Sequence, residues 1–255
     1  MRDFTISMYE CLIHVLIQRK IPFFTVYDMF SKAPSKFMVL RHDVDLLPDN
    51  SLQFAKIQAK LGIKGTYYFR TVKKSWDEHK IRQINDLGHE IGYHYETMDK
   101  ANGNIKKAWD MFRKDLDILR TLADVKTICM HGSPASNYDN KDLWSKYDYK
   151  DVGIIGEPYL DINFDDVFYL TDTGRCWDGY RFSIRDKVPQ QENWVKSGLT
   201  FNKTQQLIEK INKGFFPYKT MFTMHPQRWT NNKMKWTKEL VLQNLKNSIK
   251  KLIVK

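Results

Sequence analysis

The sequence is poor in cysteine. Its three cysteines, Cys11, Cys129 and Cys176, are widely spread over 255 residues. An odd count without any paired spacing argues against a disulfide framework and against a zinc site built from cysteine. We therefore expect reduced thiols in a reducing compartment.

Long hydrophobic runs are missing as well. No apolar run approaches the roughly 20 residues that a helix needs to span a membrane, and the mean hydropathy is −0.55. Residues 1–10 carry both signs of charge and lack the apolar core of a signal peptide. There is no repeat, low-complexity tract or long linker. These absences predict one soluble domain, and we expect it to be cytoplasmic.

Acidic residues are fewer than basic ones. The chain has 30 aspartates and glutamates and 41 lysines and arginines, which gives a net charge of +11. Such a charge favours nucleic acid, a membrane surface, or acidic sugars and sugar nucleotides as partners. The competing interpretation is that lysines in 100–114 and 233–255 form solvated helix faces. No helix-turn-helix, zinc-finger or aromatic RNA-binding signature is present, so we expect no specific nucleic-acid partner. The oligomeric state stays open.

Apolar strand patterns alternate with amphipathic helix patterns along the chain. The predicted strands are 37–45, 65–70, 90–94, 127–131, 152–155, 167–170 and 220–225. The predicted helices are 8–18, 48–62, 77–87, 105–122, 204–212 and 238–253. This alternation predicts an α/β fold with a parallel sheet. Periodicity alone leaves a barrel and a doubly wound sheet both open.

Potential ligands follow or close several of these strands. They are Asp43 and Asp45, His94, His131 and His225. Active sites of parallel α/β barrels gather at the carboxyl ends of the strands. Three of the seven histidines fall at such ends, and His42 precedes the aspartate pair. Packing alone does not explain that distribution.

The two aspartates suggest a metal. Asp43 and Asp45 share one face of the strand because side chains alternate with period two. Their carboxylates repel each other unless a cation or a proton lies between them. A divalent metal could bind one and leave the other to accept a proton. The alternative is a pair of helix-capping or salt-bridged aspartates next to Pro48. His94 lies on the side of its strand that bears no bulky apolar residue, where a neutral imidazole suits a metal.

These segments carry a family resemblance. The chain has Asp43-Val44-Asp45, a Gly-His-Glu-Ile-Gly-Tyr-His segment at 88–94 and a Met-Phe-Thr-Met-His-Pro segment at 221–226. In order and spacing it resembles the polysaccharide deacetylase family, also called NodB-homology or carbohydrate esterase family 4-like, as a divergent member. The resemblance spans roughly Phe37 to Trp229 and implies a distorted (β/α)7 barrel. We expect a single domain over 1–255, with 1–35 as an N-terminal helical extension.

The resemblance also implies a chemistry. It implies a hydrolase that removes an N-acetyl or other acyl group from a sugar or glycan. The lack of a signal peptide points to a precursor as substrate, either nucleotide-linked or lipid-linked. It implies a divalent metal, zinc first, with Co²⁺, Mn²⁺ and Ni²⁺ as alternatives. Asp43 matches the general base, Asp45 and His94 match metal ligands, and His225 matches the general acid that protonates the leaving amine.

One position departs from the family pattern. A second metal histidine is expected four residues after His94, and Met98 stands there. His131 is the first candidate for the missing ligand and Glu96 the second. If neither serves, the alternative is a catalytically impaired carbohydrate-binding protein that keeps the deacetylase fold. The arginine-bearing third motif is also replaced, by 131–134, where the backbone amides of Gly132 and Ser133 could bind an oxyanion or simply form a tight turn.

The remaining candidates are expected around the substrate. They are Arg41, Glu96, Asp172, Arg175 and Trp177. Asp172 could orient Asp43 or His225, Arg175 could hold a phosphate or carboxylate, and Trp177 could stack on a sugar. The alternative for the last two is a turn at Gly174 followed by a packed tryptophan. Arg41 is expected to pair with Asp172 or Asp43, or else to form a surface salt bridge.

Overall fold

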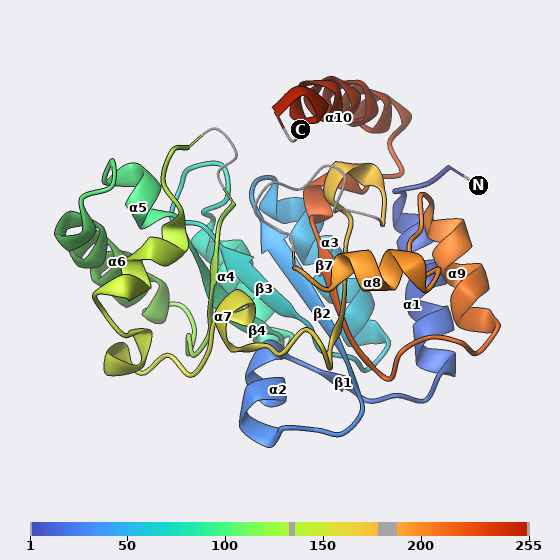
Figure 1. The fold of residues 1–255 in the computed structure, drawn as a ribbon, viewed down its shortest axis with the longest axis horizontal. Helices are drawn as coiled ribbons and strands as arrows, with labels where there is room; N and C mark the ends of the chain where they lie inside the picture. The colour runs from blue at the N-terminus through green and yellow to red at the C-terminus, as the bar shows by residue number, and fades with distance from the viewer. Residues whose placement is uncertain (1, 133–135, 178–187, 254–255) are drawn as a thin grey trace.

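The protein is built around one parallel sheet (Figure 1). The structure, a computed structural model, describes residues 2–132, 136–177 and 188–253. Its strands are β1 (Phe23–Phe24), β2 (Phe37–Val44), β3 (Thr66–Phe69), β4 (Glu90–Tyr95), β5 (Ile128–Met130), β6 (Phe168–Thr171) and β7 (Lys219–Met224). Within the described residues the order is β5-β4-β3-β2-β7-β6, with β1 also paired to β2.

Helices surround this sheet. They are α1 (Ile6–Gln18), α2 (Val26–Lys32), α3 (Pro48–Lys60), α4 (Glu78–Asp86), α5 (Thr97–Lys100), α6 (Ile105–Arg120), α7 (Pro158–Asp161), α8 (Gln191–Lys196), α9 (Thr204–Asn212) and α10 (Lys233–Ile253). Short 3₁₀ turns are η1 (Asn140–Ser145), η2 (Tyr149–Val152), η3 (Thr173–Arg175) and η5 (Pro226–Arg228). The sheet is curled, so the predicted α/β fold with a distorted barrel of parallel strands is confirmed.

Local sequence explains where several helices begin. Thr5, Thr25, Asp77 and Asn104 each place a side-chain oxygen on a backbone N–H of the first turn. Such caps satisfy donors that a helix leaves without an internal partner. The caps fix where α1, α2, α4 and α6 start, and so how each helix packs against the sheet.

Strand β2 positions the site. All its residues are buried, as expected for a central strand of a parallel sheet. It pairs with β3 on one side, where Asp43 lies opposite Tyr68, and with β7 on the other, where His42 lies opposite Met224. This register brings the segments that follow β2, β3 and β7 to one edge of the sheet.

Some elements differ from those predicted. The strand predicted at 152–155 is wrong: η2 ends at Val152, and only an isolated bridge between Thr127 and Gly156 extends the pairing there. Residues 1–35 contain β1 and α2 besides α1. Whether they form an extension to a single domain stays a prediction. Among the described residues, no helix has the length and apolarity needed to cross a membrane.

Gly92 gives a test of packing behind the site, because it lies two residues before His94 on β4. A Cβ at Gly92 would come within 2.3 Å of the Tyr68 ring and 3.2 Å of the Thr127 carbonyl oxygen. Overpacking of this kind costs about 1–3 kcal/mol. We expect Gly92→Ala to lower the free energy of unfolding by that amount in urea titrations.

The matched control is Gly198→Ala. Gly198 has φ +69° and nothing within 4 Å of its added Cβ, so only backbone strain of about 1 kcal/mol is expected. If Gly92→Ala lowers the free energy of unfolding no more than this control does, the Tyr68 ring can move aside and the close packing is not a constraint.

Candidate active site

Five predicted residues meet at the carboxyl edge of the sheet. Oδ1 of Asp45 lies 3.6 Å from Nε2 of His94 and 3.6 Å from Nε2 of His131. Its Oδ2 lies 3.9 Å from Nε2 of His225. Oδ2 of Asp43 lies 3.8 Å from Nε2 of His94. The strand ends therefore converge in one cluster, and the roles of the individual residues stay predictions.

His94 is oriented by the backbone. Its Nδ1 lies 2.9 Å from the carbonyl oxygen of Cys129 on β5. A carbonyl only accepts, so Nδ1 carries the proton and Nε2 carries the lone pair that faces the aspartates. Burial lowers the pKa of His94 to about 4, against the opposite effect of Asp43. A neutral ring at physiological pH is the form that binds a metal.

His131 is oriented by a carboxylate. Its Nδ1 lies 3.1 Å from Oε2 of Glu96, so Nδ1 faces a negative charge while Nε2 faces Asp45. Arg70 donates to the same Glu96 oxygen at 2.5 Å. Burial raises the pKa of Glu96, but His131 and Arg70 outweigh that effect and bring it to about 2. Glu96 is thus an ionised partner behind His131. Such partners orient metal-binding histidines.

Asp45 has an oxygen that the protein leaves unsatisfied. Oδ1 is buried without a hydrogen-bond partner in the part of the chain that the structure describes, whereas Oδ2 accepts from Gln227 at 3.1 Å. Burial raises the pKa of Asp45. The imidazoles of His131, His225 and His94 have a larger effect in the opposite direction, so the net pKa lies well below its usual range. A buried, ionised oxygen without a donor calls for a cation.

The donor set matches a divalent metal in its chemistry. One carboxylate and two imidazoles are ligands that Zn²⁺ binds. Over residues 2–132, 136–177 and 188–253, however, no group of three histidine, cysteine, aspartate or glutamate side chains is already spaced to hold a metal ion. Tetrahedral ligands about 2.0–2.1 Å from zinc lie roughly 3.3–3.4 Å apart, slightly closer than the 3.6 Å separations here. Asp45, His94 and His131 are the residues that would hold the metal.

Asp43 is clamped by Arg41. Nε and Nη2 of Arg41 donate to the two oxygens of Asp43 at 2.8 and 2.6 Å, and both side chains are buried. Burial raises the pKa of Asp43, but Arg41 and the nearby imidazoles reverse this and hold its net pKa below the usual range. Of the predicted partners of Arg41, Asp43 is the observed one. Arg41 is 0% exposed, so it positions Asp43 and cannot itself contact substrate.

His225 belongs to a second network. Its Nδ1 lies 2.6 Å from Oδ1 of Asp172, which follows β6. Trp229 donates to Oδ2 of Asp172 at 2.7 Å, and Arg228 donates to Oδ1 at 2.8 Å. Burial and Arg228 lower the pKa of His225, but Asp172 outweighs both and the net pKa is raised. Asp172 therefore orients His225 and not Asp43.

Two predicted substrate residues lie elsewhere. Trp177 is 1% exposed, packs against the Phe4 and Trp229 rings and donates to Thr204. The Arg175 guanidinium lies over the Phe4 and Trp236 rings. The alternative of a turn followed by a packed tryptophan describes this segment, so we do not place Arg175 or Trp177 in the site.

Other predicted positions have clear locations. Met98 is buried in the hydrophobic core and supplies no ligand. Ser133, predicted to offer a backbone amide, lies outside the described residues. His42 and His89 are buried and bind backbone carbonyls, which makes them structural.

Three residues that contact this cluster were not predicted from the sequence. Arg70 directly follows β3 and donates to Glu96, so it obeys the same strand-end rule as the histidines. Gln227 and Arg228 lie two and three residues after His225 and bind Asp45 and Asp172. A search of every strand end for all polar residues would have found Arg70. It would not have found Gln227 and Arg228, because they lie in the 3₁₀ turn η5.

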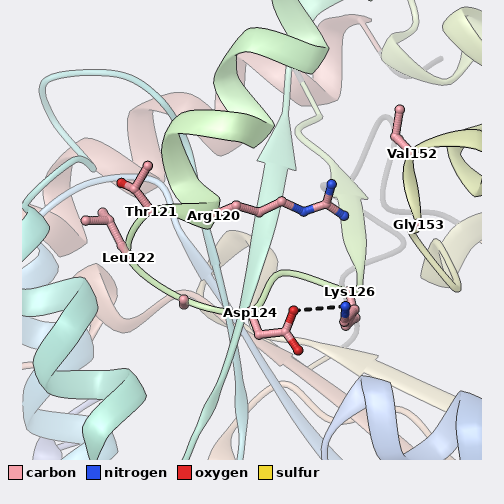
Figure 2. A pocket seen from close by; sticks show the side chains of 8 residues that line it. Arg120, Thr121, Leu122, Asp124, Lys126, Val152 and Gly153 are labelled. Atoms are coloured by element: carbon pink, nitrogen blue, oxygen red, sulfur yellow. Dashed lines mark ion pairs between the residues drawn. The ribbon is translucent and has the colours of Figure 1, made fainter.

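A surface pocket lies away from this cluster (Figure 2). It is formed by the end of α6, the start of β5 and the end of η2. Its lining residues are Arg120, Thr121, Leu122, Ala123, Asp124, Lys126, Val152 and Gly153. Lys126 precedes β5 and pairs with Asp124 at 3.0 Å, so the pocket opens at the amino-terminal edge, opposite to the histidines.

Comparisons with known proteins find structural matches only. No model of a protein family matches this chain, and no curated protein does so either. One matching structure is a CE4 family pseudoenzyme from Bacillus anthracis, with 13% identity, a TM-score of 0.46, and coverage of 84% of this chain and 61% of that one. Another is a polysaccharide deacetylase from Bacillus cereus, with 13% identity, a TM-score of 0.41, and coverage of 84% and 89%.

A third match is a family 4 carbohydrate esterase from Bacillus subtilis, with 11% identity, a TM-score of 0.39, and coverage of 82% and 75%. The present chain spans about three fifths of the first of these structures. Solved structures of the family that the sequence resembles are thus among the matches. Their low similarity leaves the activity to be derived from this chain's own residues.

Proposed function

We propose that this chain is a divergent polysaccharide deacetylase-like hydrolase, which uses a divalent metal to remove an N-acetyl or other acyl group from a carbohydrate. The observation that carries the proposal is the orphaned Oδ1 of Asp45, 3.6 Å from Nε2 of both His94 and His131. On either side lie an ionised carboxylate and a histidine with a raised pKa. Amide hydrolysis needs both a base and an acid beside one electrophile.

Asp43 is the proposed base. It lies 3.8 Å from His94, within the same cluster as Asp45. Its low pKa keeps it ionised throughout the neutral range, so it can accept a proton from an attacking water. The two hydrogen bonds from Arg41 fix the direction of its lone pairs. A metal held by Asp45, His94 and His131 would supply polarisation of the acyl carbonyl and a lower pKa for water.

His225 is the proposed acid. It approaches Asp45 from the side opposite to β4, because β7 and β3 flank β2 on different sides. Asp172 holds its Nδ1 and leaves Nε2 directed at the cluster. A raised pKa keeps this ring protonated in a larger share of molecules near neutral pH. The ring can then give a proton to the amine that leaves.

The test is acetate release. Purified protein loaded with Zn²⁺, Co²⁺, Mn²⁺ or Ni²⁺ in turn should release acetate from N-acetylated amino sugars or their oligomers. A chelator should remove the activity, and adding metal back should restore it. Absence of acetate release from every such substrate, with metal bound at one ion per chain, would reject the hydrolase.

Metal retention gives a separate prediction. His131→Ala should lose the metal, because it removes one of three proposed ligands. Glu96→Gln should weaken metal affinity by about 10–100-fold, the effect usual for a partner behind a ligating histidine. The matched control is Asp115→Asn, since Asp115 is a carboxylate bonded to Thr71 and Tyr93 outside the cluster. Metal content by elemental analysis decides, and equal retention by all three variants would contradict the ligand set.

A second function is supported by one observation. Met98 occupies the place of an expected ligand and lies in the core, which fits a carbohydrate-binding protein that keeps the fold without turnover. Metal-free protein that binds amino sugars in calorimetry but releases no acetate under any metal would favour this alternative.

A further inference from the structure

Helix α10 packs with its polar side toward the protein. Gln243 and Asn247 are buried, and they bond to each other at 2.7 Å. Asn247 also donates to the carbonyl oxygen of Gly174 in η3 at 2.9 Å. Near the start of the helix, Trp236 donates to the carbonyl oxygen of Asp3. Residues 236, 243 and 247 share one helical face by their spacing of seven and four, so this face is the one that is docked.

The apolar side of α10 faces outward. Five of its large hydrophobic residues are between 42% and 79% exposed: Met234, Val241, Leu242, Leu245 and Ile249. At 100° per residue these positions centre roughly opposite to Gln243 and Asn247. Figure 1 shows α10 at the periphery of the molecule, and among the described residues no other helix or strand lies on its outer side. Soluble helices normally bury the apolar face and expose the polar one, so this orientation is reversed.

Basic side chains accompany the exposed apolar face. Lys233, Lys235, Lys238 and Lys246 are exposed, against a single acidic residue, Glu239. Lys238 lies four residues after Met234 and three before Val241, within the apolar face itself. Lys235 and Lys246 border it on one flank. A helix that combines an outward apolar face with bordering lysines matches the surface of an anionic bilayer.

We propose that the outer face of α10 docks on an anionic membrane surface, with Val241, Leu242, Leu245 and Ile249 entering the lipid interface and the lysines contacting the phosphates. The charge favours this partner over a second copy of the chain. Two copies meeting through this face would bring Lys238 of each against the other, at a protein charge of +11 each, whereas anionic lipid neutralises it. The proposal does not depend on the deacetylase activity.

Docking would also place the candidate active site near the lipid surface. α10 holds Gly174 in η3, and η3 begins one residue after Asp172, which binds His225. The docked helix is therefore joined by one short turn to the carboxyl edge of the sheet. A membrane-bound orientation would turn this edge toward substrates at the interface.

Vesicle sedimentation with the full chain tests the proposal. Vesicles of phosphatidylcholine mixed with phosphatidylglycerol should bind the protein at low salt, and pure phosphatidylcholine vesicles should bind it far less. The variant Val241→Gln/Leu245→Gln/Ile249→Gln should reduce binding at least about tenfold. Its side chains are exposed, so unfolding is not expected, and circular dichroism verifies this. The control Phe215→Gln changes a residue that is 78% exposed after α9 and should bind like the wild type.

A second pair of variants separates a local patch from total charge. Lys235→Gln/Lys238→Gln/Lys246→Gln should weaken binding by about fivefold per lysine. The control Lys106→Gln/Lys107→Gln/Lys114→Gln removes the same charge from exposed positions of α6 and should change binding little. Equal loss in both triple variants would overturn the proposal in favour of general charge attraction.

Two other outcomes would also overturn it. One is no binding to the mixed vesicles at low salt. The other is a wild-type dimer in sedimentation equilibrium that the apolar α10 variant dissociates, without vesicle binding, because the occupant would then be a second copy.

Discussion

Replacing Arg41 with methionine should lower the free energy of unfolding by about 3–5 kcal/mol. Arg41 and Asp43 are both buried and form two hydrogen bonds at 2.8 and 2.6 Å. Methionine has a similar length but no charge, so the carboxylate of Asp43 would lose its main compensation. The pKa of Asp43, now lowered by Arg41, should rise in this variant, and the loss of stability should be largest where Asp43 would otherwise be ionised.

A double variant distinguishes the loss of the whole ion pair from the cost of leaving one charge buried without its partner. Arg41→Met/Asp43→Leu removes both ions and should recover most of the loss, because a buried ion pair replaced by apolar residues is often neutral in stability. Arg113→Met provides the control, since its pairing with Asp110 is exposed on α6 and should cost less than about 1 kcal/mol. Urea unfolding of the wild type, Arg41→Met, Asp43→Leu and the double variant measures the cycle, and Arg113→Met is measured beside them.

The pH dependence has a definite sign. A carboxyl group with a lowered folded pKa stabilises the protein above its unfolded pKa, and that stability disappears as the pH falls through the folded value. The wild type should therefore have the full contribution of Asp43 above the usual carboxyl pKa and lose it progressively as the pH falls from there toward the lowered folded pKa. If Arg41→Met unfolds at the same urea concentration as the wild type at neutral pH, the clamp is not a structural requirement.

The same pair shows what the sequence could provide. Asp43, Asp45, His94, His131 and His225 were predicted to converge because the carboxyl ends of parallel strands share one edge, and this rule depends only on strand order and length. The choice of partner for Arg41 was left between Asp43 and Asp172, since it depends on the side of the strand and on the register with β3 and β7. Strand register depends on tertiary packing and cannot be predicted from local periodicity.

The segment after β6 shows the opposite case. Asp172 was expected to orient Asp43 or His225, and it contacts His225, whereas Trp177 was expected to stack on a sugar or else to pack after a turn. Aromatic residues fill cores and sugar sites with the same apolar surface, so their type alone does not decide. Here Phe4, from the start of the chain, covers Trp177, and no local pattern reports a contact over that distance. The strand predicted at 152–155 failed similarly, because a short apolar run was taken without pairing partners.

Helix α10 shows a related case. The lysines of 233–255 were expected on a solvated helix face, and Lys233, Lys235, Lys238 and Lys246 are exposed. That Gln243 and Asn247 are the residues that dock the helix was not predicted. Amphipathic spacing defines two faces of a helix but does not say which of them meets the protein, and the reversed orientation gives those lysines an apolar neighbour.

Asp172→Asn should move the alkaline limit of activity to lower pH and reduce turnover at neutral pH by about 10²–10⁴-fold. Asp172 raises the pKa of His225, while burial and Arg228 lower it. Asparagine keeps the size and one acceptor but removes the charge, so the lowering effects remain and the ring becomes neutral. A neutral His225 has no proton for the leaving amine. The rate should therefore fall as the pH rises through a lower pKa than in the wild type.

Trp229→Phe is the matched control for the charge of Asp172. It removes a hydrogen bond of 2.7 Å to the same carboxylate but leaves the ion pair of 2.6 Å with His225, so the alkaline limb should shift far less. Nuclear magnetic resonance titration of the His225 ring measures its pKa independently of turnover. A lowered pKa with an unchanged rate profile would mean that another group donates the proton. An unchanged pKa would mean that Asp172 does not control His225. Only a joint shift of both supports His225 as the acid, because a purely structural loss would lower the rate at every pH alike.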